Sequence, residues 1–235
     1  MKFEDLSLHP TLLKAVKDQN YITPTAIQIQ AIPLILNRKD VLGSAQTGTG
    51  KTAAFALPIL HHLINEKQDN SKPKIKALIV TPTRELAIQI GENFTVYSKY
   101  TNIRNTVVFG GVNQGPQTDM LKKGVDILIA TPGRLLDLMG QGYISLKDVS
   151  YFVLDEADRM LDMGFIHDIK KLLEKLPRER QSLFFSATMP DTILKLSNTI
   201  LKHPEKVAAH QVSTTAETIK QFIYYTNKND KKDLL

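Results

Sequence analysis

The sequence contains no cysteine, which excludes disulfide bonds and cysteine-ligated zinc sites. No apolar run approaches the length that spans a membrane, and the first residues lack the apolar core of a secretion signal. The histidines show no spacing typical of metal ligands, and we find no internal repeats or low-complexity segments. These absences favour a cytoplasmic protein without a membrane partner.

The composition is that of an ordinary globular protein. Of the 235 residues, 42% are hydrophobic and 23% are charged. This length supports one sizeable domain, or one domain with a fragment of another. The formal net charge of +6 is compatible with a polyanionic partner. Many proteins without such a partner share a mild basic excess, so charge alone decides little.

Residues 45–52 read Ala-Gln-Thr-Gly-Thr-Gly-Lys-Thr and lie between an apolar run and a helical pattern. A strand, a glycine-bearing turn and a helix in this order direct backbone N–H groups around an anion. Gly48 and Gly50 let the backbone approach a phosphate closely. Lys51 can place its charge between the terminal phosphates, and the Thr52 hydroxyl can bind Mg²⁺. The alternative is a glycine-rich turn with a surface lysine.

Short apolar runs rich in β-branched and aromatic residues alternate with helical patterns along the chain. Because the runs are continuous, both faces of each strand must be covered, which predicts an α/β fold with a parallel sheet flanked by helices on both faces. Ligands bind such a sheet at the carboxyl ends of its strands, where this sequence places polar clusters. The expected strands are residues 77–80, 106–109, 127–130, 152–154 and 183–185; the expected helices include residues 10–19 and 26–36.

The tetrad Asp155-Glu156-Ala157-Asp158 directly follows one of these strands. Adjacent carboxylates at the end of a buried strand are unfavourable unless a cation neutralises them. A Mg²⁺–triphosphate would do so, with Asp155 holding the metal, usually through water, and Glu156 orienting and deprotonating the attacking water. The alternative is a set of solvated carboxylates that cap the next helix.

Residues 45–52, residues 155–158 and five further short motifs resemble, in their order along the chain, the amino-terminal motifs of DEAD-box RNA helicases. The resemblance covers residues 3–235, and residues 154–168 look most like the bacterial RhlE-type members. Ala45 and Asn20 stand where the family usually has glycine, but Asn20 affects a turn and not a contact, so we expect adenine selectivity to persist. The matching motifs are residues 21–28, 45–52, 82–87, 110–111, 131–134, 155–158 and 186–188.

The resemblance implies a RecA-like fold of the P-loop NTPase type, with ATP and Mg²⁺ as ligands. Gln28 would hydrogen-bond the adenine edge, Tyr21 would stack on the ring, and Phe3 is the aromatic that the family places upstream. The implied nucleotide-binding residues are Phe3, Tyr21, Gln28, Gln46, Thr47, Gly48, Thr49, Gly50, Lys51 and Thr52. The implied catalytic residues are Lys51, Asp155 and Glu156, and the implied Mg²⁺ ligands are Thr52 and Asp155.

The resemblance also implies contacts with the RNA backbone that do not read bases. The implied RNA-binding residues are Pro82, Thr83, Arg84, Gly110, Gly111, Thr131, Pro132, Gly133 and Arg134. Each cluster alone is also typical of a helix-capping turn, and Arg84 and Arg134 could equally form structural ion pairs. Ser186 and Thr188 would couple the nucleotide site to strand separation by hydrogen bonding toward Asp158.

We expect a first RecA-like domain over residues 1–207, with the Q motif in residues 1–30, and a linker over residues 208–218. Residues 219–235, with a strand at 219–226, would begin a truncated second RecA-like domain of the same parent chain. Such a chain would be monomeric and, without the arginines of the second domain, would hydrolyse ATP slowly and would not unwind RNA. The leading interpretation is an ATP-dependent RNA helicase. The alternatives are a DNA translocase of the same superfamily and a non-catalytic ATP-dependent RNA clamp or assembly platform.

Overall fold

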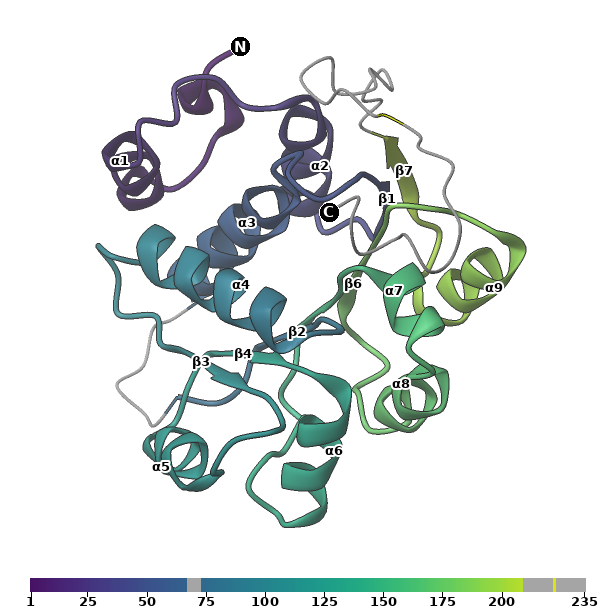
Figure 1. Cartoon of the computed structure of the whole chain (residues 1–235). Helices are drawn as coiled ribbons and strands as arrows, with labels where there is room; N and C mark the ends of the chain where they lie inside the picture. The colour runs from purple at the N-terminus through teal and green to yellow at the C-terminus, as the bar shows by residue number, and fades with distance from the viewer. Residues whose placement is uncertain (67–72, 209–221, 223–235) are drawn as a thin grey trace.

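The computed structural model describes residues 1–66, 73–208 and Phe222. In this part of the chain seven strands form one sheet in the order β3-β4-β2-β5-β6-β1-β7, and all neighbouring strands run parallel (Figure 1). The expected parallel sheet is therefore confirmed. The strands are β1 (Val41–Ser44), β2 (Ala77–Val80), β3 (Asn105–Val108), β4 (Ile127–Ala130), β5 (Tyr151–Leu154), β6 (Gln181–Ser186) and β7 (Glu205–Ala208).

Helices cover both faces of this sheet (Figure 1). Buried side chains of α1 to α4 form one hydrophobic core, and those of α5 to α9 form a second core on the opposite face. The elements on the first face are the 3₁₀ helix η1 (Phe3–Leu6), α1 (Pro10–Asp18), α2 (Ala26–Leu36), α3 (Lys51–Glu66) and α4 (Arg84–Tyr97). Those on the second are α5 (Gly115–Lys123), α6 (Pro132–Gly140), α7 (Ala157–Asp162), α8 (Ile166–Leu173) and α9 (Asp191–Ile200).

The continuous apolar strands are explained by this double coverage. Every residue of β2, β4 and β5 is buried. Along β2, Ile79 packs in the first core while its neighbours Leu78 and Val80 pack in the second. Because successive side chains point to opposite faces, each face needs apolar residues at alternate positions, and the strand becomes apolar throughout. None of the described helices is both long enough and apolar enough to cross a membrane.

The structure differs from the expected elements in the bounds of some strands and in one additional strand. β3 begins one residue earlier than expected, and β6 extends beyond the expected strand at both ends. β7 was not expected, because Glu205 and Lys206 are exposed on this edge strand and no apolar run marks it. Ala208, the first residue of the expected linker, pairs with Ser44 as the last residue of β7. The rest of the expected linker and the expected strand at 219–226 lie outside the described residues, apart from Phe222.

Candidate nucleotide-binding site

The loop between β1 and α3 forms a tight turn at the carboxyl edge of the sheet. Gly48 and Gly50 have φ angles of +86° and +93°, a conformation that side chains rarely adopt. At Gly50, a Cβ atom would also lie 2.5 Å from the side-chain nitrogen of Gln28. Ala45 is buried in the first core, and its N–H donates to the Ser186 carbonyl at 3.1 Å. An alanine is therefore accommodated where the family usually has glycine.

Lys51 begins α3 and lies beside the acidic residues that follow β5. Its Nζ is 3.8 Å from Asp155 Oδ1 and 4.0 Å from Glu156 Oε1, and the three side chains are buried. Among the described residues, however, neither Lys51 Nζ nor Asp155 Oδ1 has a hydrogen-bond partner. Buried polar groups are nearly always hydrogen-bonded in folded proteins, so these two atoms are suited to a phosphate and its cation.

The environment of Asp155 disfavours its negative charge. Burial raises the pKa of the Asp155 carboxyl from 3.8 to about 6, although the neighbouring Lys51 ammonium acts in the opposite direction. The Glu156 carboxylate raises this pKa further through like-charge repulsion. A bound cation would reverse the balance, because it stabilises the ionised carboxylate.

Glu156 is held in an unusual backbone conformation at the start of α7. Its φ of +55° and ψ of +50° are left-handed, which is uncommon for a residue other than glycine. The Thr47 hydroxyl donates to Glu156 Oε1 at 2.7 Å, and Arg159 Nη1 lies 3.4 Å from Oε2. The hydrogen bond from Thr47 connects the phosphate loop to the acidic tetrad and fixes the direction of this carboxylate.

Gln28 connects α2 to the same loop. Its Oε1 accepts a hydrogen bond from the Thr25 N–H at 2.9 Å, and its Nε2 donates to the Gly50 carbonyl at 3.1 Å. An amide side chain offers two donor hydrogens and two acceptor lone pairs. One donor and one acceptor of Gln28 therefore remain, which is the pair that the adenine edge requires.

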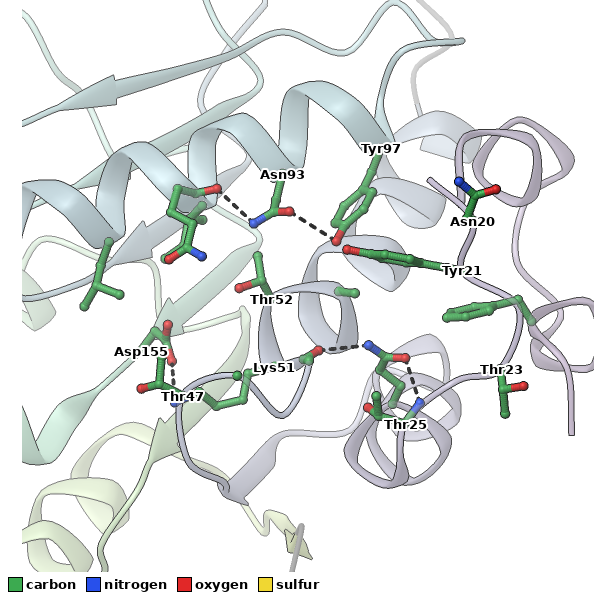
Figure 2. A pocket seen from close by; sticks show the side chains of 18 of the residues that line it. Asn20, Tyr21, Thr23, Thr25, Thr47, Lys51, Thr52, Asn93, Tyr97 and Asp155 are labelled. Carbon is green, nitrogen blue, oxygen red and sulfur yellow. Dashed lines mark hydrogen bonds and ion pairs between the residues drawn. The ribbon is translucent and has the colours of Figure 1, made fainter. Parts of the chain in front are cut away.

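These residues line a cavity of about 460 Å³. Figure 2 shows Lys51, Thr52 and Asp155 at one end of it and Tyr21 and Thr25 at the other. Tyr21 is 42% exposed. The cavity therefore offers charged groups at one end and an accessible aromatic ring at the other, an arrangement that suits a nucleotide.

The aromatic end of the cavity has a backing layer. Phe3 is buried, and its ring stacks on that of Tyr21 with centroids 6.4 Å apart. Phe3 thus supports Tyr21 from behind as well as lining the cavity. Asn20 has a φ of +57°, the left-handed conformation that glycine adopts most readily. This geometry agrees with the expectation that position 20 forms a turn.

The expected hydrogen bonds around Asp158 are present. The N–H and the hydroxyl of Thr188 both donate to Asp158 Oδ2 at 2.9 Å. The N–H of Asp158 donates to the Ser186 hydroxyl oxygen at 3.2 Å. These bonds join the end of β6 to the acidic tetrad, but their role in coupling stays a prediction.

The other polar clusters gather at the carboxyl ends of β2, β3 and β4, which are neighbours in the sheet. Thr83 accepts a hydrogen bond from the Leu86 N–H at 3.3 Å and so caps α4, while Thr131 is the N-cap residue of α6. Gly110 and Gly111 are exposed. The structure therefore brings the residues expected to bind RNA to one edge of the sheet, beside the cavity.

Near the starts of the two capped helices, the prolines are buried and Gly133 is exposed. Pro82 precedes the cap of α4 and is buried, as is Pro132 at the first position of α6. Gly133 follows Pro132 and is exposed, with nothing within 4 Å of a Cβ atom built there. The backbone at the start of α6 is therefore open to an approaching ligand.

No group of three or more His, Cys, Asp or Glu side chains in the described residues could hold a metal ion by itself. A Mg²⁺ ion that is bound to one or two protein oxygens, to phosphates and to water does not need such a group. The arrangement of Thr52 and Asp155 is compatible with that kind of site.

The sequence pattern of the DEAD/DEAH box helicase family matches residues 25–196. This chain belongs to the DEAD/DEAH box helicase family. The chain is 42% identical to ATP-dependent RNA helicase RhlB of Actinobacillus succinogenes, with 100% of this chain and 57% of that protein covered. It is 43% identical to ATP-dependent RNA helicase CshA of Limosilactobacillus reuteri, with 100% and 46% covered. The chain thus spans about half the length of the curated relatives that it matches.

A solved structure supports the same assignment of the fold. The crystal structure of a DEAD box protein from the hyperthermophile Methanococcus jannaschii is 40% identical and superposes with a TM-score of 0.82. The match covers 89% of this chain and 56% of that chain. The expected RecA-like fold of this DEAD-box chain is therefore confirmed, whereas its closeness to RhlE-type members stays a prediction.

Sequence analysis did not identify the residues of α4 that line the cavity in this DEAD-box protein, among them Asn93 and Tyr97. Asn93 and Tyr97 face the cavity, and the Tyr97 hydroxyl donates to Asn93 Oδ1 at 3.3 Å (Figure 2). Their spacing of four residues places them on one face of the helix. That spacing is equally typical of a helix face packed in the core, so the sequence carries no signal that could have identified them.

Proposed function

We propose that this chain binds ATP with Mg²⁺ and forms the ATP-binding half of an ATP-dependent RNA helicase. The observation that carries the proposal is that Lys51 Nζ and Asp155 Oδ1 are buried without a hydrogen-bond partner among the described residues, beside a loop whose glycines have positive φ angles. A triphosphate with its cation supplies the partners that both atoms lack. The similarity to relatives that are named ATP-dependent RNA helicases supports the same function.

The residues at the phosphate end have distinct roles in this proposal. Lys51 would place its ammonium group beside the terminal phosphates. Thr52 and Asp155 would hold Mg²⁺, with a water molecule between Asp155 and the ion. When bound, the ion neutralises negative charge on the phosphates. Glu156 would accept a proton from the attacking water, with its carboxylate oriented by the Thr47 hydroxyl at Oε1 and by Arg159 at Oε2.

The adenine end would select the base. Gln28 would offer its remaining N–H and its remaining lone pair to the adenine edge, and Tyr21 would stack on the ring. Guanine keeps the N7 acceptor but has the O6 acceptor where adenine has the N6 donor, so a glutamine fixed by Thr25 and Gly50 would lose one of its two hydrogen bonds to guanine.

RNA would lie along the edge formed by the ends of β2, β3 and β4, held through its backbone and not through its bases. In a longer protein, a second RecA-like domain would close over the nucleotide and the RNA, and this closure would separate a short duplex. The intact set of Lys51, Asp155 and Glu156 favours hydrolysis over a purely clamping role.

Calorimetric titration of this chain with ADP–Mg²⁺ and GDP–Mg²⁺ tests the nucleotide site. We expect ADP to bind roughly tenfold more tightly than GDP, and chelation of Mg²⁺ with EDTA to weaken ADP binding. Gln28→Ala should remove the preference. Gln30→Ala is the matched control, because Gln30 lies on the same helix but hydrogen-bonds the Ala208 backbone.

The possible results separate the two parts of the proposal. Absence of ADP binding at millimolar concentration would reject the nucleotide site. Equal affinities of the unmutated chain for ADP and GDP would reject adenine recognition by Gln28 and leave the phosphate site in place.

A further inference from the structure

The loop between β3 and α5 contains two exposed glycines that no other described residue crowds. A Cβ atom at Gly110 or Gly111 would have no neighbour within 4 Å. Gly111 has a φ of +79°, which accounts for glycine at that position. The φ of Gly110 does not lie in this positive range, so its backbone conformation does not require glycine. Packing among residues 1–66 and 73–208 therefore does not explain glycine at position 110, whereas close approach of an external ligand to the backbone would.

A buried glutamine holds the first end of this loop. Gln117 on α5 is 8% exposed. The N–H of Phe109 donates to Gln117 Oε1 at 3.2 Å, and Gln117 Nε2 donates to the Phe109 carbonyl at 3.0 Å. In the described sheet β3 is an edge strand, so this amide takes the place of a neighbouring strand and fixes the backbone just beyond β3.

Phe109, whose backbone Gln117 holds, also contacts an arginine through its ring. The Arg84 guanidinium lies over the Phe109 ring, 4.9 Å from its centroid. Stacking on an aromatic face stabilises an arginine without using its N–H donors. The position of Phe109 therefore determines where the donors of Arg84 lie at the edge of the sheet.

An arginine holds the second end of the loop. Arg134 Nη2 donates to the Val112 carbonyl at 3.0 Å, and its Nε lies 3.7 Å from Asp137 Oδ2. The side chain of Arg134 is only 12% exposed. Most of its guanidinium is thus directed into the chain and toward the loop, and away from solvent.

We propose that Gln117 and Arg134 are positioning residues for the RNA-backbone site. Between them they hold residues 109–112 at both ends, so that the amides of Gly110 and Gly111 and the guanidinium of Arg84 are ordered before a phosphate arrives. Ordering this loop during folding removes an entropic cost from binding. The inference rests on the proposed RNA binding, and it changes the expected role of Arg134 from a phosphate contact to a support of the loop.

Gln117→Leu, which keeps the size of the side chain and removes its amide, tests the first support. Its matched control is Gln114→Leu at the N-cap of α5, because the Gln114 amide bonds the Gln141 side chain and not residues 109–112. NMR order parameters of the Gly110 and Gly111 amides should fall in Gln117→Leu and stay unchanged in the control. Affinity for a ten-nucleotide poly(U) strand should weaken roughly five- to thirty-fold in Gln117→Leu alone, with ADP–Mg²⁺ affinity unchanged.

Arg134→Lys and Arg134→Ala test the second support without changing α5. A positioning role predicts that both variants lose poly(U) affinity equally, because lysine lacks the fork that contacts Val112 and Asp137 together. A direct phosphate contact predicts instead that Arg134→Lys keeps the affinity for poly(U). It also predicts that Arg134→Ala reduces the slope of the logarithm of the binding constant against the logarithm of the salt concentration by about one. That second pattern would overturn the role given to Arg134.

The order parameters keep this inference separate from the proposed function. Unchanged order at Gly110 and Gly111 in Gln117→Leu would overturn the role of Gln117. If the unmutated chain does not bind poly(U), the proposed RNA function fails, while the order parameters still decide whether Gln117 holds the loop.

Discussion

Replacing Asp155 by asparagine should stabilise the protein in the absence of nucleotide. Burial raises the pKa of the Asp155 carboxyl from 3.8 to about 6 even though Lys51 lies beside it. Since one pKa unit corresponds to about 1.4 kcal/mol, keeping this carboxylate ionised costs the folded state about 3 kcal/mol at pH 8. Asparagine is nearly isosteric and uncharged, so Asp155→Asn should raise the free energy of unfolding by about that amount.

The pH dependence gives the sign of the effect. Because the pKa of Asp155 is raised in the folded state, protonation stabilises the fold fully below pH 3.8, and this stabilisation is lost as the pH rises through about 6. The stability difference between Asp155→Asn and the unmutated chain should therefore be near its maximum at pH 8 and much smaller at pH 4.5. Groups common to both proteins cancel in this difference.

Urea denaturation followed by circular dichroism at the two pH values measures this difference. Asp162→Asn is the matched control, because Asp162 is exposed and its loss should change stability little at either pH. Asp155→Asn should also weaken ADP–Mg²⁺ binding, so stability and affinity should change in opposite directions. A variant that is less stable than the unmutated chain at pH 8, or a difference that does not change with pH, would refute the reasoning.

Two further predictions concern the phosphate loop and the opposite end of α3. Gly48→Ala and Gly50→Ala should each destabilise the fold by about 1–3 kcal/mol, because both positions have positive φ angles. Only Gly50→Ala should also reduce the preference for ADP over GDP, because its Cβ atom would displace the Gln28 side chain. Equal ADP/GDP selectivity of the two variants, measured by calorimetry, would contradict this prediction. Burial lowers the pKa of His62 below 6.5, so the unfolded chain binds this proton more readily and stability should fall as the pH drops below 6.5. His62→Gln keeps an N–H for the Ile35 carbonyl, and urea denaturation should show that this variant loses less stability on acidification than the unmutated chain does.

The part of the site that the sequence predicted well is the part built from contiguous residues. The phosphate loop at residues 45–52 and the tetrad at residues 155–158 each lie between a strand and a helix, so local order alone places them at the carboxyl edge of a parallel sheet. The continuous apolar runs likewise predicted that both faces of the sheet would be covered. These inferences depend on backbone geometry and on the period of the side chains, which a sequence displays directly.

The remaining features depend on contacts between distant segments. The bonds that connect Gln28 to Gly50 and Thr47 to Glu156 join residues far apart in the chain. β7 was missed because an exposed edge strand needs no apolar pattern, and its partner β1 precedes it by most of the chain length. In each case the sequence displays suitable residue types but does not display their neighbours.

For this protein, the sequence by itself determined the order of strands and helices, the two-faced burial of the sheet and the chemical nature of the groups at its edge. Only the tertiary structure decided that Lys51 Nζ and Asp155 Oδ1 are buried together without hydrogen-bond partners among the described residues, and that Gln117 contacts the backbone beside the glycine loop. The physical reason is that secondary structure follows from short-range periodicity, whereas the burial and the hydrogen bonding of a side chain depend on what packs against it from elsewhere in the chain.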